Sequence, residues 1–150
     1  MHPLPNIQYD FSSFRDGIST LEYKINQSNR KYDYICGIAR GGLIPAVALS
    51  YRLNIPFTSF HWSLRDSDQK TISDQTLEIL NNKNVLLVDD ICDSGETLKQ
   101  ITQLVDKHVD KAVLVYNISQ EVDCEYYHLT INRNYDKQWF DFWWDNKEMK

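Results

Sequence analysis

Two adjacent carboxylates, Asp89 and Asp90, follow a short apolar run and precede a turn, residues 93–97, that contains serine, glycine and threonine. The apolar run, residues 85–88, is too short for a buried helix and is typical of a central parallel strand. Ligands of open α/β sheets bind at the carboxyl ends of such strands, and free N–H groups at the start of the next helix bind phosphate. Because carboxylates accept hydrogen bonds from sugar hydroxyls, the pattern indicates a sugar phosphate. The alternative is that the acidic residues only cap the helix.

A second turn of the same design comes earlier in the chain. Arg40, Gly41 and Gly42 lie between an apolar run that predicts a strand, residues 34–39, and one that predicts a helix, residues 43–53. Two glycines let backbone N–H groups approach an anion closely, and the arginine adds a planar cationic donor. This pattern predicts a second anion site, and the alternative is an ordinary turn with an exposed arginine.

The elements that must position these turns alternate between strand and helix. Apolar residues at helical spacing, from Phe14 to Ile25, predict a first helix that begins at a serine cap, Ser12 or Ser13. The other predicted elements are strands at residues 54–62 and 112–118 and a helix over residues 98–105. The alternation predicts the α/β class, with a doubly wound, mainly parallel sheet flanked by helices.

Three segments fall outside this alternation. Residues 1–10 predict an extended arm that forms either an edge element or an oligomer contact. Residues 63–73 are polar, aperiodic and long for a connection inside a compact domain, which is typical of a functional lid. Residues 121–145 are rich in aromatics and lack the α/β rhythm, so we expect a small C-terminal aromatic hood.

The composition is that of an ordinary globular protein. The chain has 150 residues, 42% apolar and 25% charged, and we expect one domain over residues 1–150. A net charge of −5 without a basic run argues against a nucleic-acid surface, and no apolar run is long enough to cross a membrane. Three scattered cysteines indicate reduced thiols, and the start of the chain lacks the pattern of a signal peptide. We therefore expect a cytoplasmic protein.

The acidic turn and its strand, residues 85–98, resemble the signature with which type I phosphoribosyltransferases bind 5-phosphoribosyl-1-pyrophosphate (PRPP). The earlier turn, which begins at Ala39, resembles the pyrophosphate loop of the same family. The resemblance implies Mg²⁺ as cofactor and a pyrophosphate held by Arg40 and by the backbone N–H groups of Gly41 and Gly42. In this family the loop often contains a cis peptide bond that does not involve proline.

The same resemblance implies roles for the acidic residues. Asp89 and Asp90 would hold the ribose hydroxyls, directly or through water bound to the metal, and Asp93 would be the general base. The residues of the turn that would hold the 5′-phosphate are Ser94, Gly95, Glu96 and Thr97. We expect Glu96 to contribute through its backbone alone.

The aromatic tail is similar to the C-terminal segment of the short bacterial xanthine-guanine and archaeal hypoxanthine-type members of the family. By that resemblance Trp139 or Phe140 stacks on a purine ring, although Trp143 stands where the family has proline. The alternative is that the tail packs as core or as an oligomer contact. The lysine with which these members donate to the base is absent, and Asn117 or Ile118 occupies its place, which leaves the base open.

The sequence thus predicts an enzyme, a pentosyltransferase that joins PRPP to a nucleobase, a purine by resemblance, and releases pyrophosphate. The resemblance implies a role in purine salvage and a homodimer or homotetramer. Its partners would be small molecules, PRPP and the base. Two alternatives stay open: a regulatory module that binds PRPP or a nucleotide without turnover, and a transferase of the same fold for a pyrimidine or another acceptor.

Overall fold

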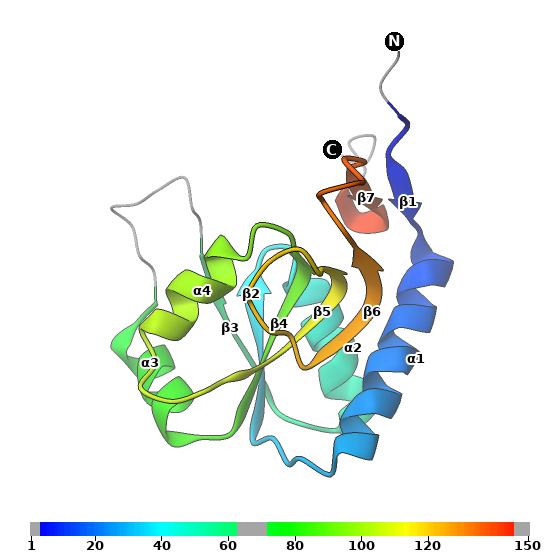
Figure 1. The fold of residues 1–150 in the computed structure, drawn as a ribbon. Coiled ribbons are helices and arrows are strands. Elements are labelled where there is room, and N and C mark those ends of the chain that lie inside the picture. Colours follow the sequence, from blue (N-terminus) through cyan, green and yellow to red (C-terminus); the bar gives the residue numbers. More distant parts are fainter. Residues whose placement is uncertain (1–3, 63–71, 146–150) are drawn as a thin grey trace.

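The computed structural model describes residues 4–62 and 72–145, which form a five-stranded parallel sheet with helices on both faces and a separate pair of strands above one edge (Figure 1). The elements in chain order are β1 (Ile7–Tyr9), α1 (Phe11–Ser28), β2 (Tyr34–Ala39), α2 (Leu43–Leu53), β3 (Phe57–His61), α3 (Asp74–Asn82), β4 (Val85–Cys92), α4 (Glu96–Gln103), β5 (Asp110–Asn117), β6 (Tyr126–Ile131), β7 (Phe140–Phe142) and a 3₁₀ helix (Trp143–Asp145). The sheet order is β3-β2-β4-β5-β6, so the predicted doubly wound architecture is confirmed.

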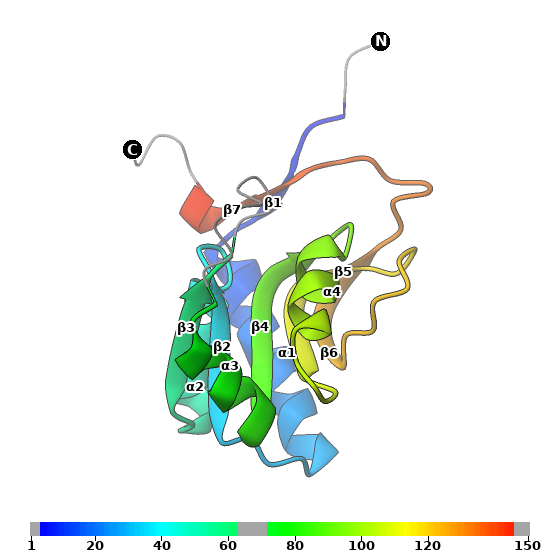
Figure 2. The ribbon, with the colours of Figure 1, turned by 90° about the vertical axis from the view of Figure 1, so that its left-hand side faces the viewer.

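Two helices lie on each face of the sheet. Figure 2 shows α3 and α4 in front of the sheet and α1 behind it. The predicted apolar stripe of α1 is buried, from Phe14 to Ile25. The predicted serine cap is wrong: the carboxylate of Asp10 accepts a 2.8 Å hydrogen bond from the backbone N–H of Ser13, and the helix begins one residue after Asp10. An aspartate caps a helix N-terminus as well as a serine does, and Asp10 stands immediately before the first helical residue, whereas Ser12 and Ser13 lie within the first turn.

Strand β4 is longer than the apolar run predicted. It continues through the carboxylates to Cys92, because its pairing with β5 extends to Cys92 opposite Tyr116. Its pairing with β2 ends at Val88. Asp89 and Asp90 therefore lie within β4 but beyond its last residue paired with β2, toward the carboxyl ends of the strands.

Strand β6, an edge strand of the five-stranded sheet, was not predicted. Residues 126–131 pair in parallel with β5, so the expectation that residues 121–145 lack the α/β pattern is wrong for this part. A parallel connection normally contains a helix, but here residues 118–125 make it without one. Within this connection, Val122 and Cys124 pack in the hydrophobic cluster on the α3 and α4 face, where a helix would otherwise lie.

The two ends of the chain form the hood. Strand β1 pairs in parallel with β7, with Ile7 opposite Phe140, so the predicted N-terminal arm is an edge element of the hood. Behind it, the rings of Phe142 and Trp144 stack with centroids 4.9 Å apart. The hood lies above the carboxyl ends of the main strands (Figure 1).

The remaining expectations concern the lid, the cysteines and membranes. Nearly all of the predicted lid, residues 63–73, lies outside the described residues. The three cysteines are buried free thiols, as predicted. Among the helices of the described ranges, none combines the length and hydropathy that crossing a bilayer requires.

Candidate active site

The two glycine-containing turns meet at the carboxyl ends of β2 and β4. A Cβ atom added to Gly41 would lie 2.1 Å from Oδ2 of Asp90, and one added to Gly42 would lie 2.5 Å from the backbone oxygen of Val88. The Ala39–Arg40 peptide bond is cis, as the resemblance implied. Only glycine lets the first turn lie this close to the acidic strand. The predicted pyrophosphate loop and the predicted ribose carboxylates are therefore direct neighbours.

Asp89 and Asp90 form a partly buried acidic pair. The backbone N–H of Asp90 donates to Oδ1 of Asp89 at 2.9 Å, and that of Ile91 donates to Oδ1 of Asp90 at 2.7 Å. Burial raises the pKa of Asp89 well above its ordinary value, and the charge of Asp90 raises it further. Burial also raises the pKa of Asp90. Two carboxylates that destabilise each other are suited to a cation, and Mg²⁺ prefers oxygen ligands.

In the metal-free protein, Asp89→Asn should raise Tm near pH 7 by about 2–4 °C, the shift that ~1 kcal/mol produces in a domain of this size. A raised folded-state pKa means that stability falls as the pH rises from about 4, the ordinary aspartate pKa, through the folded-state pKa. The gain should therefore vanish near pH 4. Thermal unfolding in EDTA at both pH values measures it, with the exposed Asp123→Asn as control. A lower Tm at pH 7 would contradict the expectation.

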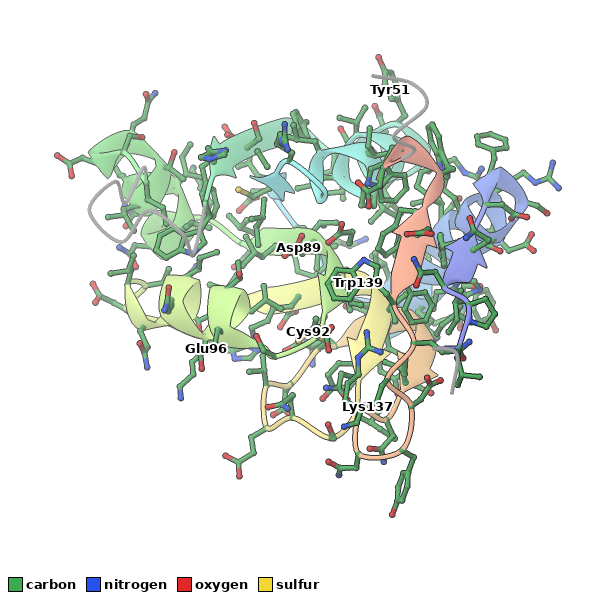
Figure 3. The ribbon with its side chains drawn as sticks, turned by 90° about the horizontal axis from the view of Figure 1, so that it is seen from above. Tyr51, Asp89, Cys92, Glu96, Lys137 and Trp139 are labelled. Carbon is green, nitrogen blue, oxygen red and sulfur yellow. The ribbon has the colours of Figure 1, made fainter. Side chains whose placement is uncertain are left out.

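The predicted phosphate turn begins α4. Gly95 is the N-cap with a φ of 81°, a left-handed conformation that favours glycine. A cavity of about 100 Å³ lies against this turn and is lined by Asp89, Ile91, Cys92, Asp93, Ser94, Gly95, Thr97 and Leu98. Glu96 is exposed, and Figure 3 shows its side chain on the outer side of α4. Only the backbone of Glu96 is therefore available to a ligand in this cavity.

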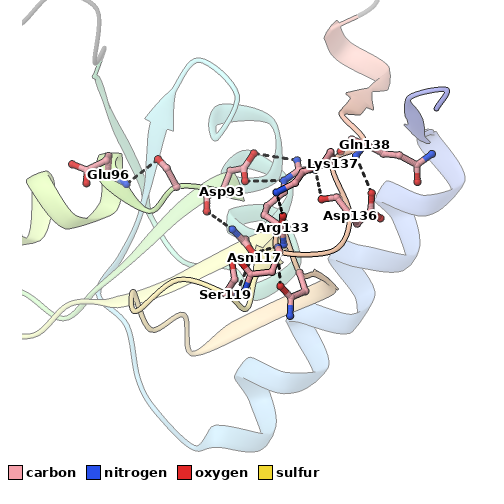
Figure 4. Close-up of polar contacts among 11 residues, drawn as sticks. Asp93, Glu96, Asn117, Ser119, Arg133, Asp136, Lys137 and Gln138 are labelled. Carbon is pink, nitrogen blue, oxygen red and sulfur yellow. Dashed lines mark hydrogen bonds and ion pairs between the residues drawn. The ribbon is translucent and has the colours of Figure 1, made fainter. Parts of the chain in front are cut away.

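An arginine that the sequence analysis missed holds Asp93. Nε and Nη2 of Arg133 donate to the two carboxylate oxygens of Asp93 at 3.0 and 3.1 Å (Figure 4). Nη1 of Arg133 donates to the backbone oxygen of Gln138. Arg133 therefore ties the phosphate turn to the segment that leads into the hood. In the sequence Arg133 could have been noticed only as a cationic residue shortly after residues 126–131, which were not predicted to form a strand.

Asn117 lies beneath the phosphate turn and is 1% exposed. Its Nδ2 donates to the backbone oxygen of Asp93 at 2.8 Å, and its Oδ1 accepts from the backbone N–H of Arg133 at 3.1 Å and from Ser119. The acceptor Oδ1 is thus occupied by Ser119 and Arg133, and one of the two N–H groups of Nδ2 is used by Asp93. The predicted contact with the base stays a prediction.

The two candidate stacking residues differ in exposure. Trp139 is 63% exposed, whereas the side chain of Phe140, in β7 of the hood, is 6% exposed and packs in the hydrophobic core. Figure 3 labels Trp139 near Asp89 in the view from above, and Trp139 lines one cavity together with Asp90. A second cavity, of about 80 Å³, is lined by Asp90, Ile91, Arg133, Trp139, Phe140, Phe142 and Asp145. Of the two aromatics, Trp139 has a ring free to cover a ligand here.

Another cluster of possible metal ligands lies elsewhere. Nε2 of His108 is 3.2 Å from Oδ1 of Asp110 and 2.7 Å from Oε1 of Glu125. Asp110 begins β5, so this cluster is at the opposite end of the sheet from Asp89. Arg30 also places a positive charge 2.8 Å from Asp110, which disfavours a bound cation. The cluster does not belong to the site at the carboxyl edge.

The fold and the site define a class: an α/β protein with two glycine-containing turns, both predicted to bind anions, at the carboxyl ends of a parallel sheet and an aromatic hood above them. The family model of the phosphoribosyl transferase domain matches residues 9–146. The chain belongs to this family.

Individual relatives agree with this assignment. The chain is 30% identical over 82 residues, 51% of its length and 49% of the relative's, to the xanthine-guanine phosphoribosyltransferase of Cereibacter sphaeroides. The match thus spans about half of that curated relative. The crystal structure of a purine phosphoribosyltransferase from Pyrococcus horikoshii superposes with a TM-score of 0.74 at 27% identity, covering 95% of this chain and 96% of that one. A hypothetical protein from Neisseria gonorrhoeae with bound ppGpp superposes with a TM-score of 0.70 at 26% identity, covering 99% and 94%.

Proposed function

We propose that this protein transfers the 5-phosphoribosyl group of PRPP to a purine base and releases pyrophosphate. The observation that carries the proposal is the meeting of the two anion-binding turns, where the backbone of Gly41 lies against the carboxylate of Asp90. A phosphate turn, a pyrophosphate loop and an acidic pair between them match the three parts of PRPP: phosphate, pyrophosphate and ribose. The relatives named as purine phosphoribosyltransferases support the acceptor class.

Asp89 and Asp90 would hold the ribose hydroxyls and Mg²⁺. The fit is chemical: two partly buried carboxylates with raised pKa values offer the oxygen ligands that Mg²⁺ binds. When bound, the ion would neutralise the pyrophosphate. Arg40 and the backbone N–H groups of Gly41 and Gly42 would stabilise the same departing charge from the other side.

The residues of the phosphate turn and the hood would complete the site. The backbone N–H groups of residues 94–97 would bind the 5′-phosphate at the start of α4. Asp93 would accept the proton that the base loses as its bond to the ribose forms. Trp139 would cover the base and exclude water from the reacting carbon, whose positive charge develops as pyrophosphate leaves.

The direct test is pyrophosphate release from PRPP and Mg²⁺ in the presence of hypoxanthine, guanine, xanthine, adenine or uracil. We expect turnover with at least one purine, formation of the matching nucleoside monophosphate, and loss of activity in EDTA. Absence of turnover with every base would overturn the proposal. Turnover with uracil alone would assign a pyrimidine acceptor instead.

A regulatory nucleotide-binding role is the second candidate, favoured by the Neisseria gonorrhoeae protein with bound ppGpp. ppGpp is a guanine nucleotide with two pyrophosphate groups, and both anion-binding turns of this site could take one. Calorimetric titration with ppGpp tests this candidate. Binding without any turnover would make the protein a regulatory module, whereas binding that competes with PRPP in an active protein would make ppGpp an inhibitor.

Trp139→Ala should raise KM for the base by about 5- to 100-fold, because stacking of a base on an aromatic ring contributes about 1–3 kcal/mol. Tm should stay at its wild-type value, since Trp139 is 63% exposed. Steady-state kinetics with varied base and saturating PRPP measure the effect. The matched control is Tyr135→Ala, an exposed aromatic four residues earlier that lines neither site cavity. Equal effects of the two substitutions would contradict a stacking role for Trp139.

We also propose a cytoplasmic, single-domain protein that forms a homodimer or homotetramer. Exposed aromatics on the main domain, Tyr51 on α2 and Phe57 on β3, support a contact between copies away from the site (Figure 3 labels Tyr51). Light scattering on the purified protein tests the oligomeric state, and a monomer at all concentrations would contradict it.

A further inference from the structure

Arg133 holds its guanidinium between the phosphate turn and the hood. Nε and one N–H of Nη2 are used by Asp93, at 3.0 and 3.1 Å. Nη1 donates to the backbone oxygen of Gln138 and lies 3.4 Å from that of Asp136. Of the five N–H groups of a guanidinium, one on Nη2 is left without a partner among the described residues. The side chain of Arg133 as a whole is 15% exposed.

Asp93 places acceptors beside this donor. Each of its carboxylate oxygens accepts one hydrogen bond from Arg133 and keeps a lone pair for another. Asp93 lines the phosphate cavity, whereas Arg133 lines the cavity beneath Trp139. The pair therefore bridges the two cavities and presents a donor and an acceptor side by side.

A carbonyl oxygen on the base needs an N–H donor, and few side chains at the cavity beneath Trp139 can supply one. Among the residues that line the cavity beneath Trp139, the side-chain N–H donors are those of Arg133 and the indole of Trp139. Asn117, which occupies the place of the family's lysine, donates one N–H of Nδ2 to Asp93, accepts through Oδ1 from Ser119 and Arg133, and lines neither cavity. Arg133 is therefore the cationic donor available to a base seated under Trp139.

We propose that Arg133 determines which base this protein accepts; this inference rests on the proposed transfer to a purine. Arg133 donates to O6 of the base while Asp93 accepts from N7–H, the ring proton that the base loses when N9 bonds to the ribose. A 6-oxopurine carries these two groups on one edge. Adenine carries an amino group in place of the carbonyl, so two donors would face each other, and a desolvated unpaired donor is costly. The site should therefore select 6-oxopurines over adenine.

The test compares wild type, Arg133→Met and Arg133→Lys in two assays. The first measures kcat/KM with hypoxanthine and with adenine, and the second measures calorimetric affinity for IMP and for AMP. For wild type we expect a preference for the 6-oxo ligand in both assays. Arg133→Met should reduce that preference by about 10- to 100-fold, as loss of a hydrogen bond to a charged group does. Arg133→Lys, which keeps one charged donor, should retain part of it.

A purely structural role would lower activity with both bases equally and leave their ratio unchanged. The matched control is Arg30→Met, which removes an arginine–aspartate pair at the opposite end of the sheet and should leave the ratio and the activity unchanged. The inference would be overturned if Arg133→Met kept the same ratio of kcat/KM for hypoxanthine and adenine as the wild-type protein, or if the wild-type protein preferred adenine. The proposed transfer would stand in both cases. A different outcome would separate the two proposals. If wild type shows no turnover but binds IMP more tightly than AMP, and Arg133→Met removes this difference in affinity, the proposed transfer is overturned and the role of Arg133 in selecting the base is supported.

Discussion

Asp93→Asn is expected to lower kcat by about 10²–10⁴-fold, the range over which a positioned general base contributes. Affinity for PRPP should stay close to that of wild type, because the 5′-phosphate would rest on backbone N–H groups of the turn rather than on this side chain. The amide oxygen of asparagine still accepts from Arg133, so the pair that holds the turn is weakened but not abolished. The substitution removes the group that can take a proton, together with one of the two hydrogen bonds from Arg133.

Single-turnover kinetics and calorimetric titration with PRPP and Mg²⁺ separate the two effects. Asp106→Asn is the matched control, since Asp106 is exposed and lines neither site cavity. A large loss of PRPP affinity in Asp93→Asn would make Asp93 a binding residue. An unchanged kcat would leave it as a positioning group for Arg133.

Gly41→Ala is expected to lower the affinity for PRPP while the fold is kept, whereas Gly42→Ala is expected to lower the stability of the fold. The Cβ of the first would lie 2.1 Å from Oδ2 of Asp90, the end of a side chain that can move away, so the fold should survive while the ribose and metal site is displaced. We expect PRPP affinity to fall by more than about tenfold, as loss of one charge-assisted hydrogen bond does.

The Cβ of Gly42→Ala would lie 2.5 Å from the backbone oxygen of Val88 and 2.6 Å from that of Ile38. Both atoms belong to paired central strands that cannot yield, so overpacking should cost at least about 1–3 kcal/mol and lower Tm by about 2–4 °C for each kcal/mol. Thermal unfolding and PRPP titration on both variants make each the control of the other. If Gly41→Ala bound PRPP as tightly as wild type, Asp90 would have no role in PRPP binding. If Gly42→Ala kept the wild-type Tm, the expected overpacking against Val88 and Ile38 would be contradicted.

Patterns within one stretch of chain predicted the sheet well. The strand and turn of residues 85–98 could be assigned because the apolar run, the acidic pair and the glycine are consecutive, and their geometry follows from local backbone preferences. The end of β4 could not be assigned, since its last residues are held by pairing with β5 rather than by their own apolar character. Strand β6 was missed for a similar reason: the connection before it carries no helix.

The sequence by itself was sufficient to indicate the family, because each of the two turns that are predicted to bind anions is a continuous run of residues. Only the tertiary structure decided what surrounds them. It pairs Asp93 with Arg133, 40 residues away, and it hydrogen-bonds the amide of Asn117 to the backbone oxygen of Asp93. It also leaves Trp139 rather than Phe140 exposed. These contacts join β4, β5, β6 and the hood, and no local periodicity encodes which side chains meet across four elements. The phosphate turn was therefore predictable from its own residues, whereas the residue that we propose to select the base was not.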